Sequence, residues 1–291
     1  MPVWVSRRWR VYTRHLNSMT IGIAWVGRRK DGREHLYLAT DSRTRGAYTF
    51  DSCPKILTLP RSDCALCFAG STADAYPLML QMANAIAAHE PARDRSLDIA
   101  RVKAHLLRIF TDLIRGLKEP VIPFASGDAQ FLFAGYSWLS KDYRIWTINY
   151  SPKEHAFTAR EAQSFHPRLR KVAFIGDWST RLRSAIAKDL GRSEGGALYL
   201  EPLASISAMI ANASKDDTIG GAPQLIRITQ HMTTRALCVR WKNQDTLFGR
   251  PLFDYENTDY WSVDPYSGKF SQPRKFGNRW REEPIEDDAE P

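Results

Sequence analysis

Apolar and polar positions alternate along the first part of the chain in a pattern typical of β-strands. Residues 20–27 and 36–39 are rich in β-forming residues and flank a polar loop whose Asp31-Gly32 pair is a hairpin signal. A second hairpin is expected to turn at residues 60–63. Its strands and the later ones are predicted over residues 47–59, 64–69, 131–138, 143–150, 171–175, 224–230 and 235–241.

Helical spacing of apolar residues separates these groups of strands. A helix is predicted from about Thr72 to His89, with Ser71 or Thr72 as its N-cap. Pro77 is expected to limit or distort its first turn. Other helices are predicted over residues 97–117, 179–190 and 203–213.

The order of these elements is strands, two helices, strands, two helices and strands. Such an order favours an α+β fold in which helices cover the outer faces of two packed antiparallel sheets. We therefore expect a four-layer αββα sandwich formed by one domain over residues 20–244.

The two ends of the chain differ from this central part. Residues 1–19 are basic and aromatic, and we interpret them as an N-terminal extension or propeptide, or as the product of a misassigned start. Residues 245–281 are rich in aromatic residues, Pro and Gly, so we expect them to pack along a surface of this chain or of a neighbouring subunit. Residues 282–291 are acidic and are expected to be a disordered tail.

Composition excludes several classes of protein. Hydrophobic residues make up 43% of the 291 positions, which is enough for a substantial core. Apolar runs long enough to span a membrane and the apolar segment of a secretory signal are both missing, so we expect a cytoplasmic protein without a membrane partner. The net charge is +9, but its Lys and Arg residues are scattered, so no nucleic-acid partner is predicted.

Cys64 and Cys67 have the spacing of a redox or zinc site. They lie within a predicted strand, where residues three apart point to opposite faces. We therefore expect both to be buried structural residues. The histidines show no pair at metal-binding spacing and no nucleotide fingerprint is present, so neither a metal nor a cofactor is predicted.

Four polar or turn residues occur in an order that suggests catalysis. Thr20 stands after Met19 at the start of the first strand, Asp41 follows the returning strand, Lys55 lies within the next strand, and Gly70 follows the strand over residues 64–69. A threonine at a free N-terminus holds both a nucleophilic hydroxyl and a basic α-amine. Internal threonines lack that amine, so this chemistry requires loss of residues 1–19.

This block resembles the N-terminal half of proteasome β-type peptidases, including the HslV and Anbu rings, which are N-terminal-nucleophile hydrolases. The resemblance is carried by Ala39-Thr40-Asp41-Ser42-Arg43, Lys55 and Gly70-Ser71-Thr72-Ala73-Asp74-Ala75, and it returns in places up to about residue 240. It implies that Thr20 is the nucleophile, exposed when Met19 is the true start and is removed. Cleavage of a propeptide is the other route.

The resemblance also implies roles for the other residues. Lys55 stabilises the Thr20 alkoxide, Asp41 holds Lys55 charged and oriented, and the Gly70 N–H binds the oxyanion. In the second half the family has serines where this chain has Asp177 and Ile219, and Asp216 supplies the family's aspartate. We predict that Asp177 binds the Thr20 amine and raises its pKa.

Three functions remain open. The first is a threonine-type endopeptidase that acts on polypeptides inside a homo-oligomeric ring. The second is a catalytically silent ring or scaffold subunit whose C-terminal extension binds a partner. The third is an amidase for small molecules. Cleavage preference, ring size and the involvement of a partner ATPase are left open.

Overall fold

The computed structural model describes residues 20–29, 31–46, 48–118, 124–125, 127–164, 170–192 and 198–273. The predicted N-terminal extension, the acidic tail and residues 274–281 of the aromatic segment lie outside these residues. No described helix combines the length and the apolar character that crossing a bilayer requires.

The larger sheet has nine strands and carries the start of the described chain. Its main path runs in the order β10-β1-β2-β11-β12-β13-β14, and β15 and β16 extend it from β12. The strands are β1 (Gly22–Arg28), β2 (Glu34–Thr40), β10 (Val172–Ile175), β11 (Gln224–Ile228), β12 (Thr234–Trp241), β13 (Gln244–Leu247), β14 (Arg250–Pro251), β15 (Ser262–Val263) and β16 (Phe270–Ser271).

A second sheet and a short ribbon contain the remaining described strands. The five-stranded sheet has the order β5-β6-β7-β8-β9, and β3 pairs only with β4. Their bounds are β3 (Thr44–Arg45), β4 (Thr49–Phe50), β5 (Ile56–Thr58), β6 (Cys64–Gly70), β7 (Ala129–Ser137), β8 (Asp142–Ser151) and β9 (Ala156–Glu161).

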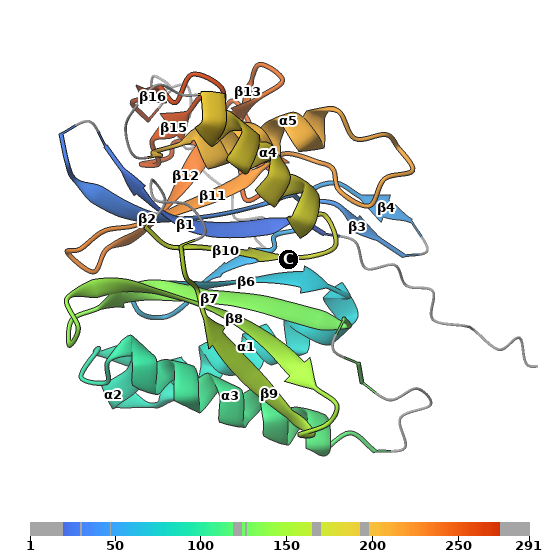
Figure 1. Cartoon of the computed structure of the whole chain (residues 1–291), viewed down its shortest axis with the longest axis vertical. Helices are drawn as coiled ribbons and strands as arrows, with labels where there is room; N and C mark the ends of the chain where they lie inside the picture. Colours follow the sequence, from blue (N-terminus) through green and yellow to red (C-terminus); the bar gives the residue numbers. More distant parts are fainter. Residues whose placement is uncertain are drawn as a thin grey trace, which may run out of the picture.

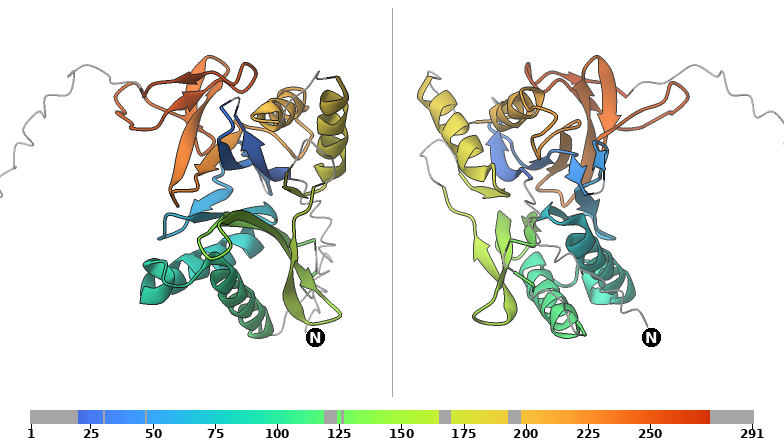
Figure 2. Two further views of the ribbon diagram at one scale, coloured as in Figure 1. Left: turned by 60° about the vertical axis from the view of Figure 1, so that its left-hand side comes forward. Right: turned by 90° about the vertical axis from the view of Figure 1, so that its right-hand side faces the viewer.

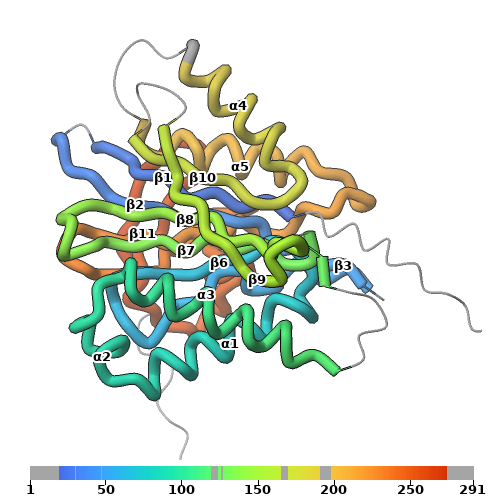
Figure 3. The backbone as a smooth tube through the Cα atoms, turned by 60° about the horizontal axis from the view of Figure 1, so that its bottom comes forward, coloured from blue at the N-terminus to red at the C-terminus, as the bar shows by residue number. Residues whose placement is uncertain are grey.

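Three apolar clusters hold the sheets and helices together. Helices α4 (Ser179–Arg192) and α5 (Glu201–Ala211) share one cluster with the larger sheet. Helices α1 (Thr72–Ala88), α2 (Glu90–Arg93) and α3 (Ile99–Arg115) share another with the five-stranded sheet. A third cluster fills the space between the two sheets. The two groups of helices lie on opposite sides of the strands (Figures 1, 2 and 3).

The expected four-layer αββα sandwich of two antiparallel sheets is wrong. The described strands form three sheets, and the largest is not wholly antiparallel because β15 runs parallel to β12. The protein is a mostly antiparallel β-sheet structure with five described helices. The prediction failed because residues 244–271, treated largely as an extension, contribute four short strands to the larger sheet.

Most of the predicted helices and strands are present. Helix α1 begins after Ser71, whose hydroxyl accepts a hydrogen bond from the Asp74 N–H, and it continues through Pro77. Cys64 and Cys67 are unpaired and fully buried, and they face different apolar clusters, as predicted for a structural strand. Strand β9 and the short helix α2 were not predicted.

Candidate active site

Thr20 lies two residues before the start of β1, at the edge of the space between the two main sheets. Ile21 and Ile23 pack into the cluster beneath α4 and α5. Side chains alternate between the faces of a strand, so Thr20 and Gly22 face the five-stranded sheet. The Thr20 side chain is almost fully buried, at 3% exposure.

Asp41 and Lys55 form a buried ion pair close to Thr20. The Lys55 Nζ lies 2.8 Å from Asp41 Oδ1, and the two side chains are 1% and 0% exposed. The same carboxylate oxygen accepts the N–H of Ile21 at 3.3 Å. Asp41 thus connects the lysine ammonium to the main chain immediately after Thr20.

The other Asp41 oxygen is also fully engaged. Oδ2 accepts the N–H groups of Arg43 and Gly220, each at 3.1 Å. Burial raises the pKa of the Asp41 carboxyl, whereas the Lys55 ammonium and the N–H groups of Arg43 and Ile21 lower it. Burial is the largest of these effects, and the hydrogen bonds that the partners donate to the carboxylate offset it in part.

Gly70 brings a backbone N–H to the Thr20 hydroxyl. The Gly70 N lies 3.5 Å from Thr20 Oγ1, at the junction of β6 and α1. Gly70 has φ +127°, and a Cβ built on it would lie 2.5 Å from the Asp128 carbonyl oxygen. A side chain is therefore excluded both by backbone conformation and by space. A donor this close to a nucleophile is suitably placed for an oxyanion.

Gly176 forms the opposite wall of the Thr20 position. Its φ is +86°, and an added Cβ would lie 1.9 Å from the Thr20 carbonyl oxygen. The Gly176 N–H donates to Gln130 Oε1 at 2.9 Å. This close backbone approach requires glycine and holds the end of β10 against Thr20.

Asp177 is the next residue after Gly176 in the chain, and it is exposed. Partial burial raises the pKa of its carboxyl. Among the described residues, no hydrogen bond joins the Asp177 carboxyl to Thr20. The predicted contact with the amine therefore stays a prediction.

Asp216 and Ile219 are not brought to Thr20. Asp216 is exposed, and its carbonyl oxygen, rather than its carboxylate, accepts a hydrogen bond from Arg45. Ile219 is fully buried in the cluster beneath α4 and α5. Hydrogen bonds thus link Thr20 to Gly70 directly, and the Asp41–Lys55 pair to the Ile21 N–H that follows Thr20. The described contacts give the Asp216 carboxylate no role.

Two glutamines near the site were missed at the sequence level. Gln130 binds Gly176, and Gln224 hydrogen-bonds to main-chain groups of Asp41 and Lys55. A polar residue at the start of the mostly apolar strand β11 was the available signal for Gln224.

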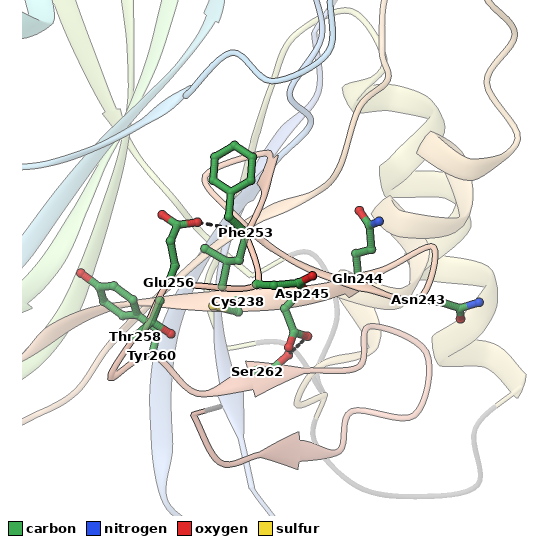
Figure 4. A pocket seen from close by; sticks show the side chains of 11 residues that line it. Cys238, Asn243, Gln244, Asp245, Phe253, Glu256, Thr258, Tyr260 and Ser262 are labelled. Atoms are coloured by element: carbon green, nitrogen blue, oxygen red, sulfur yellow. Dashed lines mark hydrogen bonds between the residues drawn. The ribbon is translucent and has the colours of Figure 1, made fainter. Parts of the chain in front are cut away.

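A separate pocket lies within the C-terminal segment, lined by residues that include Cys238, Asp245, Glu256 and Tyr260 (Figure 4). Asp245 accepts hydrogen bonds from Arg240 and Ser262. Glu256 accepts hydrogen bonds from Arg250 and from the Phe253 N–H. These acidic groups stabilise the local fold. Across the described residues, no group of three or more His, Cys, Asp or Glu side chains is arranged to hold a metal ion.

Comparison of the chain with protein-family models and with curated proteins found no relative.

Proposed function

We propose that this protein is a threonine-type amide hydrolase of the N-terminal-nucleophile kind, with Thr20 as its nucleophile. The observation that carries the proposal is the buried Lys55–Asp41 ion pair, bound through Asp41 Oδ1 to the N–H that follows Thr20. Burying two charges costs several kcal/mol per ion before their attraction is counted. The ion pair is bound to the main chain directly after Thr20, and the Gly70 N–H reaches the Thr20 hydroxyl. This arrangement is consistent with a catalytic use of the two charges.

The chemistry follows from these groups. The Thr20 Oγ attacks the amide carbonyl carbon, and the free α-amine of Thr20 takes the hydroxyl proton. The C–N bond breaks as the leaving amine receives that proton, which leaves an ester on Thr20. Water then hydrolyses the ester and restores the hydroxyl. The Gly70 N–H stabilises the oxyanion, and the Lys55 ammonium stabilises the alkoxide.

The substrate proposed first is a polypeptide, cleaved inside a homo-oligomeric ring with the Thr20 sites facing inward. This part rests on the resemblance to proteasome-type peptidases. Enclosure would keep a threonine site of low selectivity away from folded proteins. A small-molecule amide is the alternative substrate for the same chemistry.

A catalytically silent subunit is the second candidate function. It is favoured by Asp177 and Ile219, which stand where the family has serines, and by the exposure of the Asp216 carboxylate. Such a subunit would keep the Lys55–Asp41 pair as a structural feature only.

The test compares chains that begin at Thr20 with chains that begin at Met1. Both are assayed against a panel of fluorogenic peptides and simple amides, with the Thr20→Ala form of the shorter chain as control. We expect activity only in the chain that begins at Thr20, rising with pH as the amine, with a reference pKa of about 7.7–8.0, loses its proton. Equal activity of the Met1 chain or of Thr20→Ala would refute the mechanism.

Intact-mass analysis of protein from its native host completes this test. A mature chain that begins at Thr20 supports the hydrolase. Recovery of inactive chains that retain Met1 supports the silent subunit.

A further inference from the structure

Gln224 places a buried carboxamide between the two main sheets. It begins β11, lies opposite Thr40 of β2 and is 1% exposed. Ile226, two residues later, packs in the cluster between the sheets, so the Gln224 side chain faces the same way. A polar group in such an apolar layer is costly unless all of its atoms are hydrogen-bonded.

The surrounding groups satisfy this carboxamide completely. Gln224 Oε1 accepts the N–H groups of Lys55 at 3.0 Å and Ile56 at 3.3 Å. Its Nε2 lies 2.7 Å from the Cys53 carbonyl oxygen and 2.9 Å from Ser42 Oγ. It also lies 3.3 Å from the Asp41 carbonyl oxygen. Donors on one side and acceptors on the other leave a single orientation for the amide.

These bonds hold the main chain on both sides of the ion pair. Asp41 follows β2 in the larger sheet, whereas Lys55 precedes β5 in the five-stranded sheet. The separation of the two main chains determines whether the Lys55 ammonium reaches Asp41 at 2.8 Å. Gln224 hydrogen-bonds to both, although it is far from either in sequence.

We propose that Gln224 is a positioning residue of the hydrolase. It sets the distance between the main chains of Asp41 and Lys55 and thereby holds the ammonium against the Asp41 carboxylate. The expected effect of Gln224 on turnover rests on the proposed function. Its expected effect on the position of the Lys55 main chain does not rest on that function.

Only glutamine meets this geometry. Glutamate keeps the acceptor for Lys55 and Ile56 but turns its second oxygen toward three acceptors, which repels them. Asparagine is one methylene shorter. Methionine has a similar length and fills the space but provides no comparable hydrogen bonds.

The experiment uses Gln224→Met and Gln224→Glu, with Gln81→Glu on the exposed surface of α1 as the matched control. All chains begin at Thr20. Amide hydrogen exchange is followed at Lys55 and Ile56, and kcat and KM are measured on any substrate that the parent cleaves. For Gln224→Met we expect exchange faster by about tenfold or more and kcat lower by about tenfold or more, with KM nearly unchanged. Gln81→Glu should match the parent.

The outcomes separate the two proposals. A parent chain that cleaves no substrate defeats the proposed function, and the exchange data then decide the role of Gln224 alone. Unchanged exchange in folded Gln224→Met overturns the positioning role, and so does faster exchange with unchanged kcat in an active enzyme. Should Gln224→Met not fold, Gln224→Glu decides. Its kcat should fall by a similar factor, and parental kcat overturns the proposal.

Discussion

At the scale of single residues, the burial of the Lys55–Asp41 pair couples catalysis to stability. Both side chains lie away from water, so removing one leaves an uncompensated buried charge. We expect Lys55→Met and Asp41→Asn each to abolish most turnover and to lower the free energy of unfolding by about 3–5 kcal/mol. Chemical denaturation and peptide assays of chains that begin at Thr20 measure the two effects.

The double variant provides the control for this prediction. Combining Lys55→Met with Asp41→Asn removes both charges, so its loss of stability should be well below the sum of the single losses. Its turnover should remain lost, because the alkoxide has no cation. Parental turnover in folded Lys55→Met would remove Lys55 from the mechanism.

At the scale of elements, the junction between β6 and α1 aims a backbone donor at Thr20. Gly70 permits this with φ +127°, where a Cβ would collide with the Asp128 carbonyl oxygen. Gly70→Ala should therefore shift the strand end and move the N–H away from Thr20 Oγ1. We expect kcat to fall by about 10²–10³, as after loss of an oxyanion donor. The free energy of unfolding should fall by about 1–3 kcal/mol.

Gly46→Ala is the matched control, because a Cβ at Gly46 meets no atom within 4 Å and its φ lies outside the left-handed region. This variant should keep the kinetics of the parent. If Gly70→Ala also keeps parental kcat while it remains folded, the Gly70 N–H is not the oxyanion donor.

At the scale of the whole molecule, the C-terminal segment is part of the larger sheet. Strand β15 pairs with β12, and Val263 is fully buried in the apolar cluster that α4 and α5 share with the larger sheet. Ending the chain at residue 244 would expose the edge of β12 and remove Val263 from the core. Each large apolar side chain so removed costs about 1.5–3 kcal/mol. We expect this truncation to melt at a lower temperature and to aggregate through the open edge.

A chain that ends at residue 273 keeps β13 to β16 and should melt like the parent. Light scattering of both truncations also tests the proposed ring. An intact protein that is a stable monomer at micromolar concentration would defeat the ring. A chain ending at residue 244 with parental melting would show that the segment is dispensable.

The sequence by itself determined the local elements and part of the site. Helices α1 and α3 and the hairpin of β11 and β12 could be predicted because their periodicity and caps are local. The proposed grouping of Thr20, Asp41, Lys55 and Gly70 also came from the sequence, through the resemblance of this block to proteasome-type peptidases.

Only the tertiary structure decided how the strands are distributed and which polar groups meet. The parallel pairing of β15 with β12 depends on chain reversals that carry no local periodicity. The exposure of Asp216 and the contacts of Gln224 were equally hidden. Burial and hydrogen bonding between residues far apart in sequence depend on how the sheets pack, whereas strand and helix patterns arise from neighbours along the chain.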